Sequence, residues 1–509
     1  MNRNIKLLAL AALSGAAIMV ACNKKLDVVN ENNPTVDSYF KTAAELQNGV
    51  NAVYSSLRAG NLVGREWFFT HDMRGAETNA GGSQLEAPRA ELLKQASPSS
   101  SNAVMTSVWN GCYQMINRAN TVINAAPNVT DNIALRDVTV GEAEFLRAWA
   151  YFELVTMWGD VPVYTDPVLS VTDFKAKSPA ADVYTLIITD LTDAASKLPA
   201  VASQQGRATS GAANALLGKV QLQNGNYDAA KEALLKVYGK YSLVPYLNNF
   251  DGDIKLGSNE IASGHEYNPE SIFEVSFVDK GDNNFNWGYT GEGATADVSI
   301  MRSQEYGIVW GNVIPSDQIL NEFEPNDPRY KYTFFEPGDN YNSSRTPNSN
   351  GTIDVILTEA NMNVAASNHN GVIEKRVYRK YSILDWTNDG FHPDGVNQRI
   401  IRYADVLLML AECEAEAGSP AAAASYINEV RARPGVNMPP VSTPDKNKAI
   451  AAVMHERAVE LAGEEVNNID ILRWRKKGYY PSIRPDPKPG QVDLFPIPAS
   501  EIAANPLVK

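Results

Sequence analysis

The feature that most constrains the fold is an apolar segment at residues 141–158, GEAEFLRAWAYFELVTMW. Phe145, Trp149 and Phe152 follow one another at i, i+4 and i+7, so they share one face of a helix. Apolar residues also occupy the flanking faces and leave only a narrow polar stripe. The segment therefore predicts a core helix packed on several sides. Gly159 follows it and is typical of a helix end.

Apolar residues at helical spacing predict further helices along the chain. These helices cover residues 43–57, 104–125, 179–198 and a pair within 210–238. In that pair Gly218 lies twelve residues before Ala230, and the same spacing separates Ala411 from Ala423. Tetratricopeptide units place small residues where paired helices approach closely. The sequence therefore predicts a mainly α fold with a scaffold of tetratricopeptide-like helical hairpins.

A long segment of different composition, residues 248–397, separates the two hairpins. It is rich in Asn, Gly, Asp and aromatic residues and has few helical periods. Residues 270–278 alternate between apolar and polar side chains, which predicts a strand. A loop-rich segment of this length in a compact protein is usually functional. We expect an insertion with short strands that takes part in binding.

The N-terminus has the pattern of an export signal. Arg3 and Lys6 precede an apolar run at residues 7–20 that is too short to span a bilayer comfortably. Small residues before Cys22 resemble a bacterial lipobox, in which cleavage precedes a lipid-bearing cysteine. We expect residues 1–21 to be a lipoprotein signal peptide and residues 22–37 a lipidated tether. The alternative is an ordinary secretory signal cut at a nearby small residue.

Composition and motifs argue against several classes of function. The net charge of -14 disfavours nucleic acid and anionic membrane surfaces as partners. The chain has no Gly-x-Ser-x-Gly, Walker or His-Glu-x-x-His motif, and its five histidines share no ligand spacing. We therefore expect no enzyme, no metal and no cofactor. A glycosidase that uses two catalytic carboxylates stays an alternative, because the 59 acidic residues always include a possible pair.

Two cysteines remain beyond the N-terminus. Cys112 and Cys413 both fall in helical patterns and lack the spacing of a metal site. We expect both to be small buried hydrophobic residues. A bridge between them is the alternative.

Several motifs, taken together and in order, resemble those of the SusD/RagB family, the glycan- or nutrient-capturing lipoproteins of Bacteroidetes outer membranes. The apolar helix carries F-L-R-A-x-x-Y-F-x-L-V-x-x-W-G-D-V-P, and W-x-x-x-Y-x-x-I-x-x-A-N runs from Trp109 to Asn120. N-P-E-S-I-F-E-V follows in the insertion, and I-R-Y-A-D-V-L-L-M-L-A-E begins at Ile401. Pro434 departs from the Ala-Gly that relatives commonly carry. The matches extend from Cys22 to the last residues.

The resemblance implies a SusD-like fold with three regions. These are an N-terminal helical region at 38–247, a loop-rich ligand-binding insertion at 248–397 and a C-terminal helical region at 398–509. It also implies a glycan-binding lipoprotein, anchored in the outer membrane and facing the cell exterior. Such a protein captures nutrient and delivers it to a SusC-like TonB-dependent transporter. The first alternative is a peptide-binding RagB-like lipoprotein serving the same kind of transporter, and the second is a tetratricopeptide scaffold without a small ligand.

Sugar binding needs aromatic rings for the apolar C–H faces and polar side chains for the hydroxyls. We assign the tryptophans on predicted helices to the core; these are Trp109, Trp149, Trp158 and Trp474. Residues in irregular, glycine-rich segments are better candidates for ligand contact. The predicted contacts are Trp67, Asp72, Arg74 and Glu77 in the segment 58–101, and Trp287, Tyr289 and Trp310 in the insertion, with Trp386 in reserve.

Overall fold

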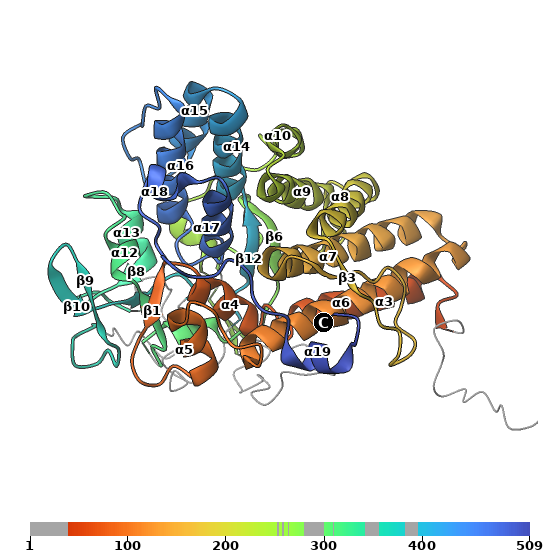
Figure 1. Ribbon diagram of the computed structural model, residues 1–509. Coiled ribbons are helices and arrows are strands. Elements are labelled where there is room, and N and C mark those ends of the chain that lie inside the picture. Colours follow the sequence, from red (N-terminus) through yellow and green to blue (C-terminus); the bar gives the residue numbers. More distant parts are fainter. Residues whose placement is uncertain are drawn as a thin grey trace, which may run out of the picture.

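The computed structural model describes residues 39–251, 254–256, 259–262, 264–278, 300–308, 310–341, 356–381 and 395–508. Cys22, Trp287, Tyr289 and Trp386 lie outside these residues. The described part is mainly helical, and its strands form only two-stranded antiparallel sheets, which confirms the predicted fold class. Helices fill the upper and right-hand parts of Figure 1, and several of the short strands lie towards the left-hand edge.

Within the described residues, the N-terminal region contains eight α-helices, several of which pack around the apolar segment. They are α3 (Ala43–Leu57), α4 (Glu66–Arg74), α5 (Ala87–Lys94), α6 (Ala103–Ala125), α7 (Ile133–Trp158), α8 (Ala180–Lys197), α9 (Ser210–Asn224) and α10 (Tyr227–Leu235). α7 begins before the apolar segment, with the Asn132 side chain accepting from the N–H of Leu135. It is buried continuously from Thr139 to Trp158 and contacts α3, α6 and α8. Gly159 ends it with a positive φ of 75°, so the predicted core helix is confirmed.

Helical hairpins recur in both halves of the chain. The second half contributes α14 (Tyr403–Ala417), α15 (Pro420–Arg431), α16 (Lys446–Glu460), α17 (Asn467–Lys476), α18 (Tyr479–Ser482) and α19 (Ala499–Ala504). A Cβ at Gly218 of α9 would lie 2.4 Å from the Leu234 side chain of α10, so only glycine allows this approach. Ala230, Ala411 and Ala423 are fully buried. The predicted hairpins are confirmed.

Short elements of the insertion join it to both helical regions. They are β4 (Ile254–Leu256), β5 (Asn259–Ala262), β6 (Ser271–Val275), α11 (Arg302–Tyr306), β7 (Val313–Pro315), α12 (Asp317–Leu320), α13 (Arg329–Thr333), β8 (Phe334–Phe335), β9 (Ala366–His369), β10 (Val372–Lys375) and β11 (Val377–Tyr378). β7 pairs with β1 (Thr78–Ala80) of the N-terminal region. β6, the predicted strand, pairs with β12 (Gln398–Arg402) at the start of the C-terminal region.

A buried network of charged side chains locks the insertion against the C-terminal helices. Glu460 of α16 accepts hydrogen bonds from Arg402 at 2.6 Å and Arg329 at 3.0 Å, and it lies 3.2 Å from Arg433. Glu270 pairs with both Arg402 and Arg433. Each of these side chains is at most 1% exposed. Buried charges of this kind persist only when they are paired and hydrogen-bonded, as here.

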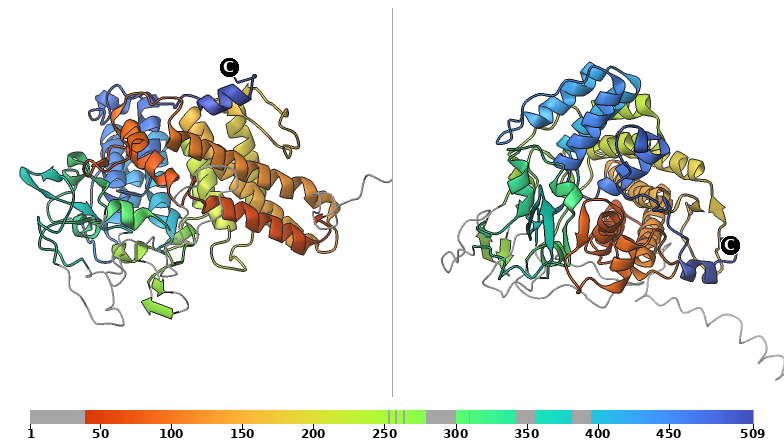
Figure 2. Two further views of the ribbon diagram at one scale, coloured as in Figure 1. Left: turned by 90° about the horizontal axis from the view of Figure 1, so that it is seen from below. Right: turned by 60° about the vertical axis from the view of Figure 1, so that its left-hand side comes forward.

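The last residues return across the N-terminal helices. We call residues 491–508 the C-terminal strap. The N–H of Phe495 donates to the Met157 carbonyl at 2.8 Å, and the N–H of Ala499 donates to the Ser100 carbonyl at 2.8 Å. The strap places α19 beside the loop between β2 (Val161–Pro162) and β3 (Lys177–Ser178), as both views in Figure 2 show.

The four tryptophans assigned to the core, Trp109, Trp149, Trp158 and Trp474, are all buried, which confirms that assignment. Cys112 and Cys413 are buried free thiols, so they are not bridged.

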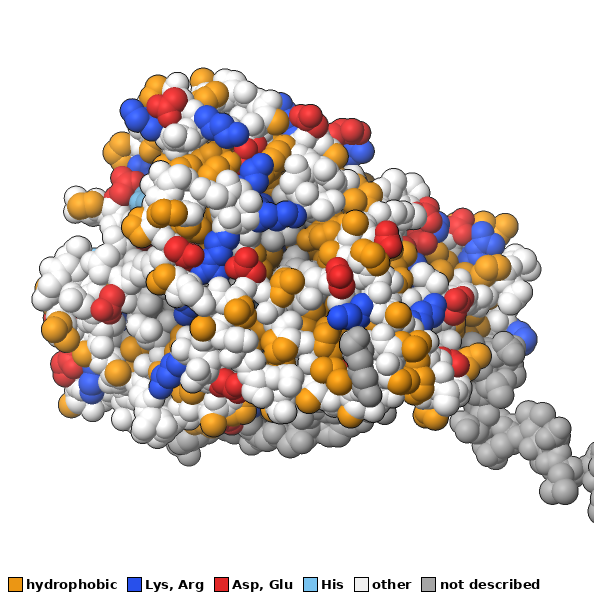
Figure 3. Space-filling view, viewed as in Figure 1, with side chains coloured by type: hydrophobic (Ala, Val, Ile, Leu, Met, Phe, Trp, Pro, Cys, Tyr) orange, Lys and Arg blue, Asp and Glu red, His pale blue; other side chains and the backbone are white. Residues whose placement is uncertain are grey.

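Among the described residues, no helix combines the length and the apolar composition needed to cross a membrane. On the face seen in Figure 3, described side chains of both charges are interspersed with apolar ones and gather in no large patch of one sign.

Candidate ligand-binding site

The segment expected to be a ligand-binding loop is partly helical. Residues 66–74 form α4, and Trp67 on this helix is only 5% exposed. Its ring centroid lies 6.2 Å from that of Trp149 in α7 and 5.2 Å from that of His71. A ring packed in this way has no face left for a sugar. The prediction of Trp67 as a ligand contact is therefore wrong for this conformation.

The three polar residues predicted with Trp67 are also buried, and each joins distant parts of the chain. Asp72 accepts a hydrogen bond from the Tyr306 hydroxyl at 2.6 Å, and Glu77 accepts one from the N–H of Gly463 at 2.8 Å. Burial raises the pKa of Asp72 and raises that of Glu77 well above its usual range. Arg74 donates to a strap carbonyl at 2.6 Å. These contacts contradict a role for the three side chains in binding ligand directly.

The remaining predicted residues belong to the insertion. Trp310 is half-buried and packs against the main hydrophobic core. Trp287 and Tyr289 lie outside the described residues. Their role as ligand contacts stays a prediction.

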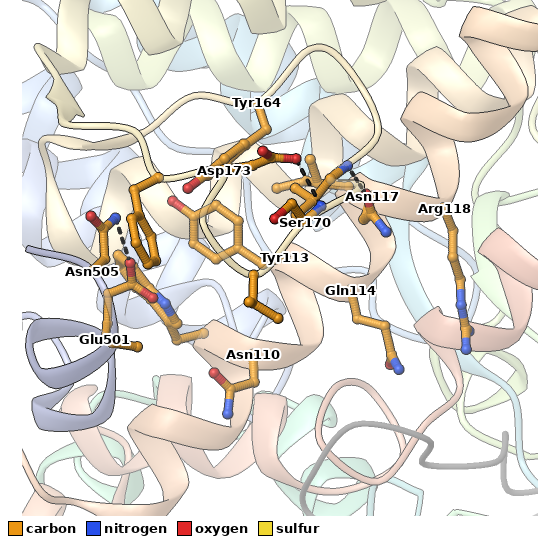
Figure 4. A pocket seen from close by; sticks show the side chains of 16 residues that line it. Asn110, Tyr113, Gln114, Asn117, Arg118, Tyr164, Ser170, Asp173, Glu501 and Asn505 are labelled. Atoms are coloured by element: carbon orange, nitrogen blue, oxygen red, sulfur yellow. Dashed lines mark hydrogen bonds between the residues drawn. The ribbon is translucent and has the colours of Figure 1, made fainter. Parts of the chain in front are cut away.

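A different face of the molecule carries a groove of about 780 Å³, which we call the α6 groove (Figure 4). Its floor is α6, one wall is the loop at residues 163–176, which we call the groove loop, and the other wall is α19 of the strap. The side chains labelled in Figure 4 are Asn110, Tyr113, Gln114, Asn117, Arg118, Tyr164, Ser170, Asp173, Glu501 and Asn505.

One row of asparagines on α6 holds the groove loop in place. The Asn117 Oδ1 accepts from the N–H of Val168 at 2.8 Å, and the Asn120 Nδ2 donates to the Tyr164 carbonyl at 2.9 Å. Asn124 donates to the next carbonyl along the loop at 3.0 Å. The three asparagines lie at i, i+3 and i+7 and therefore share one side of the helix. The loop backbone is fixed to the floor at three points.

Two tyrosines form the centre of the groove. The ring centroids of Tyr113 and Tyr164 lie 6.0 Å apart with the rings perpendicular. The Tyr113 hydroxyl donates to the Pro162 carbonyl at 2.8 Å, and the Tyr164 hydroxyl accepts from the N–H of Lys175 at 3.2 Å. Burial raises the pKa of Tyr113 well above its usual range, so this phenol stays neutral. Both rings are half-buried and oriented by protein contacts before any ligand arrives.

The strap closes the groove on its other side. The Asn505 side chain donates to the Lys175 carbonyl of the groove loop and to Glu501 of α19, both at 2.9 Å. Within the loop, Asp173 accepts from two backbone N–H groups and shapes the turn at its tip. The two walls are therefore joined to each other.

The α6 groove suits a polyhydroxylated ligand. It offers aromatic rings, side-chain amides and carboxylates, the groups that bind C–H faces and hydroxyls. Within the residues that the structure describes, no three His, Cys, Asp or Glu side chains gather as metal ligands would. The sequence did contain a signal for this site. Asn and Gln recur at residues 110, 114, 117, 120 and 124, so α6 has an uncharged polar face that a core helix does not need.

Two protein families match the chain in succession. The family described as starch-binding associating with outer membrane matches residues 25–222, and the SusD family matches residues 269–493. Among curated proteins, SusD-like protein P2 of Formosa agariphila is 26% identical over 503 residues, which cover 93% of this chain and 94% of that protein.

Solved structures show the same fold. A laminarin binding SusD-like protein is 25% identical with a TM-score of 0.70, and the match covers 92% of this chain and 99% of that one. A SusD-like carbohydrate binding protein from Bacteroides fragilis is 20% identical with a TM-score of 0.72, covering 92% and 100%. The family and these neighbours are binding proteins. This chain is a SusD-like protein and belongs to the SusD/RagB family.

Proposed function

We propose that this chain is a cell-surface lipoprotein that binds a glycan in the α6 groove and passes it to a SusC-like TonB-dependent transporter. The observation that carries the proposal is the groove itself, which combines two oriented tyrosine rings with side-chain amides. A glycan is favoured over a peptide because the similar structure with 25% identity is that of a laminarin binding protein. The family description starch-binding supports the same class of ligand.

The N-terminal sequence and the family support attachment to the outer membrane as part of this proposal. Cys22 is the residue that would carry the lipid, and residues 22–37 would be the tether. Several acyl chains on one cysteine would make the attachment effectively permanent. The protein would then stand on the cell surface beside its transporter, with the described residues facing outward.

Calorimetry with the best ligand from a glycan array tests the proposal. Tyr164→Ala removes one ring from the groove centre and should weaken binding roughly fivefold, because a stacking contact contributes about 1 kcal/mol. Tyr238→Ala is the matched control, since this exposed tyrosine lies after α10 and does not line the groove. Equal affinity of the two folded variants would move the site away from the α6 groove.

The alternatives make different predictions in the same experiments. Binding of peptides but not glycans would favour the RagB-like alternative, and co-purification with neither ligand nor an outer-membrane barrel would favour a scaffold. A glycan recovered intact after long incubation is expected of a binding protein. Shortened products would indicate a hydrolase instead.

A further inference from the structure

The exposed side of α6 carries a second row of polar side chains, which the groove loop does not use. Asn110, Gln114 and Arg118 follow one another at intervals of four residues, and Figure 4 shows them along one edge of the helix. Tyr113 and Asn117 lie on the neighbouring strip that faces the groove loop. The two rows border the same groove, but only the first is hydrogen-bonded to the groove loop.

The second row has unused hydrogen-bonding capacity. Within the described part of the chain, the side-chain amides of Asn110 and Gln114 make no hydrogen bond, and the Gln114 Oε1 is buried without a partner. A buried hydrogen-bond acceptor without a partner carries a free-energy penalty in the free protein. A ligand hydroxyl that donates to this oxygen would remove that penalty. Arg118 uses one nitrogen to donate to the Ser56 Oγ at 2.6 Å and to the Ala52 carbonyl at 3.1 Å. These bonds hold the guanidinium at the end of the row.

The spacing of the row matches a repeating ligand. Residues four apart on an α-helix are separated by about 6 Å along its axis. This is close to the length of one pyranose unit in a chain that runs straight, as equatorial 1,4-linked sugars do. A chain that coils, as 1,3-linked β-glucans and α-1,4-linked glucans do, bends away from a straight helix after one or two units.

We infer that the α6 groove reads three consecutive sugars of an extended glycan, laid parallel to α6 with one sugar beside each of Asn110, Gln114 and Arg118. This inference rests on the proposed glycan binding and adds the conformation of the chain that is recognised. Binding is directed at an internal stretch of polymer, because α6 continues past both ends of the row and the row does not enclose a chain end.

The first test compares neutral hexasaccharides by calorimetry on the full chain. The extended set is cellohexaose, mannohexaose and xylohexaose, and the coiled set is laminarihexaose and maltohexaose. The ligand with the highest affinity should belong to the extended set. Its affinity should exceed that of both coiled ligands by at least tenfold. Its shorter homologues should gain affinity up to about three sugars and little beyond. A coiled hexasaccharide that binds as tightly as any extended one overturns the inference, and so does binding of none of the five. In either case, another array ligand that still depends on Tyr164 leaves the proposed function standing.

The second test uses the row itself. Gln114→Ala should lower the affinity for the extended ligand about tenfold, since the middle contact of the row is lost. It should also lower the ratio of that affinity to the affinity for the coiled ligands. Gln84→Ala, which removes an exposed amide before α5, is the matched control and should change neither quantity. Both variants should unfold at the same urea concentration as the unaltered chain. If Gln114→Ala leaves the ratio of affinities for extended and coiled ligands unchanged, the row does not recognise the conformation of the glycan. This holds whatever the effect of the substitution on overall affinity.

Discussion

Replacing Glu460 with glutamine should destabilise the protein by about 3 kcal/mol. Burial alone would raise the pKa of Glu460, but Arg433, Arg402 and Arg329 outweigh burial and hold the pKa at about 2, against an ordinary value of 4.5. Each pKa unit corresponds to about 1.4 kcal/mol of preference for the charged form, and the fully buried site leaves no solvent screening to discount. The result agrees with the roughly 3–5 kcal/mol lost when one partner of a buried ion pair is removed.

Urea unfolding followed by tryptophan fluorescence measures this loss. The matched control is Glu232→Gln, because the Glu232 side chain is 77% exposed and its ion pair with Lys236, at 3.5 Å, lies at the surface. An exposed pair of this kind contributes at most about 0.5 kcal/mol. Equal unfolding midpoints for the two variants at pH 7 would refute the reasoning.

The pH dependence gives a second check. The pKa of Glu460 is lower in the folded than in the unfolded state, so its contribution is fully present above pH 4.5 and is lost as the pH falls towards 2. The difference in stability between the unaltered chain and Glu460→Gln should therefore shrink across this window. A difference that stays constant from pH 5 to pH 3 would show that the carboxylate charge is not the source.

Three further predictions follow from packing and from the N-terminal motif. Ala230→Leu and Ala423→Leu should each overpack a helical hairpin and lower the free energy of unfolding by about 1–3 kcal/mol, whereas unchanged urea midpoints would contradict the buried positions. Asn120→Ala should free the groove loop and speed its cleavage by trypsin, and unchanged cleavage would show that the other contacts suffice. Cys22→Ala should leave the protein without lipid and outside the membrane fraction, and mass spectrometry of the unaltered N-terminus decides whether lipid is present at all.

The helices were predictable from the sequence because their signals are local. The apolar face of α7 repeats within a few turns, and Gly218 is close in sequence to the helix that it contacts. The strand at residues 270–278 is recognisable for the same reason, although its partner β12 lies far along the chain. Periodicity identifies an element without revealing what covers it.

The residues of the proposed site were not predictable because exposure is set by distant contacts. The segment around Trp67 has charged and glycine neighbours, which is typical of a loop, yet those charges meet partners from far along the chain. Arg65, for example, donates to Glu305 at 2.6 Å across 240 residues of sequence. The converse holds for α6. Its row of Asn and Gln side chains is visible in the sequence, but it was not predicted as a binding face. Only the fold shows that Asn117 and Asn120 are occupied by the groove loop whereas Gln114 is not.

Arg74 shows how a residue can serve a site that it does not touch. It donates to the Val492 carbonyl and lies over the Phe495 ring at 5.4 Å, so it holds the start of the strap against the N-terminal helices. Farther along the strap, α19 forms one wall of the α6 groove and Asn505 ties that wall to the groove loop. The groove is thus built from three segments that are fixed before ligand binds, and a preorganised site loses less entropy on binding a flexible chain. Arg74 of α4 therefore supports the proposed site by fixing the start of the strap, whose α19 forms one wall of the groove.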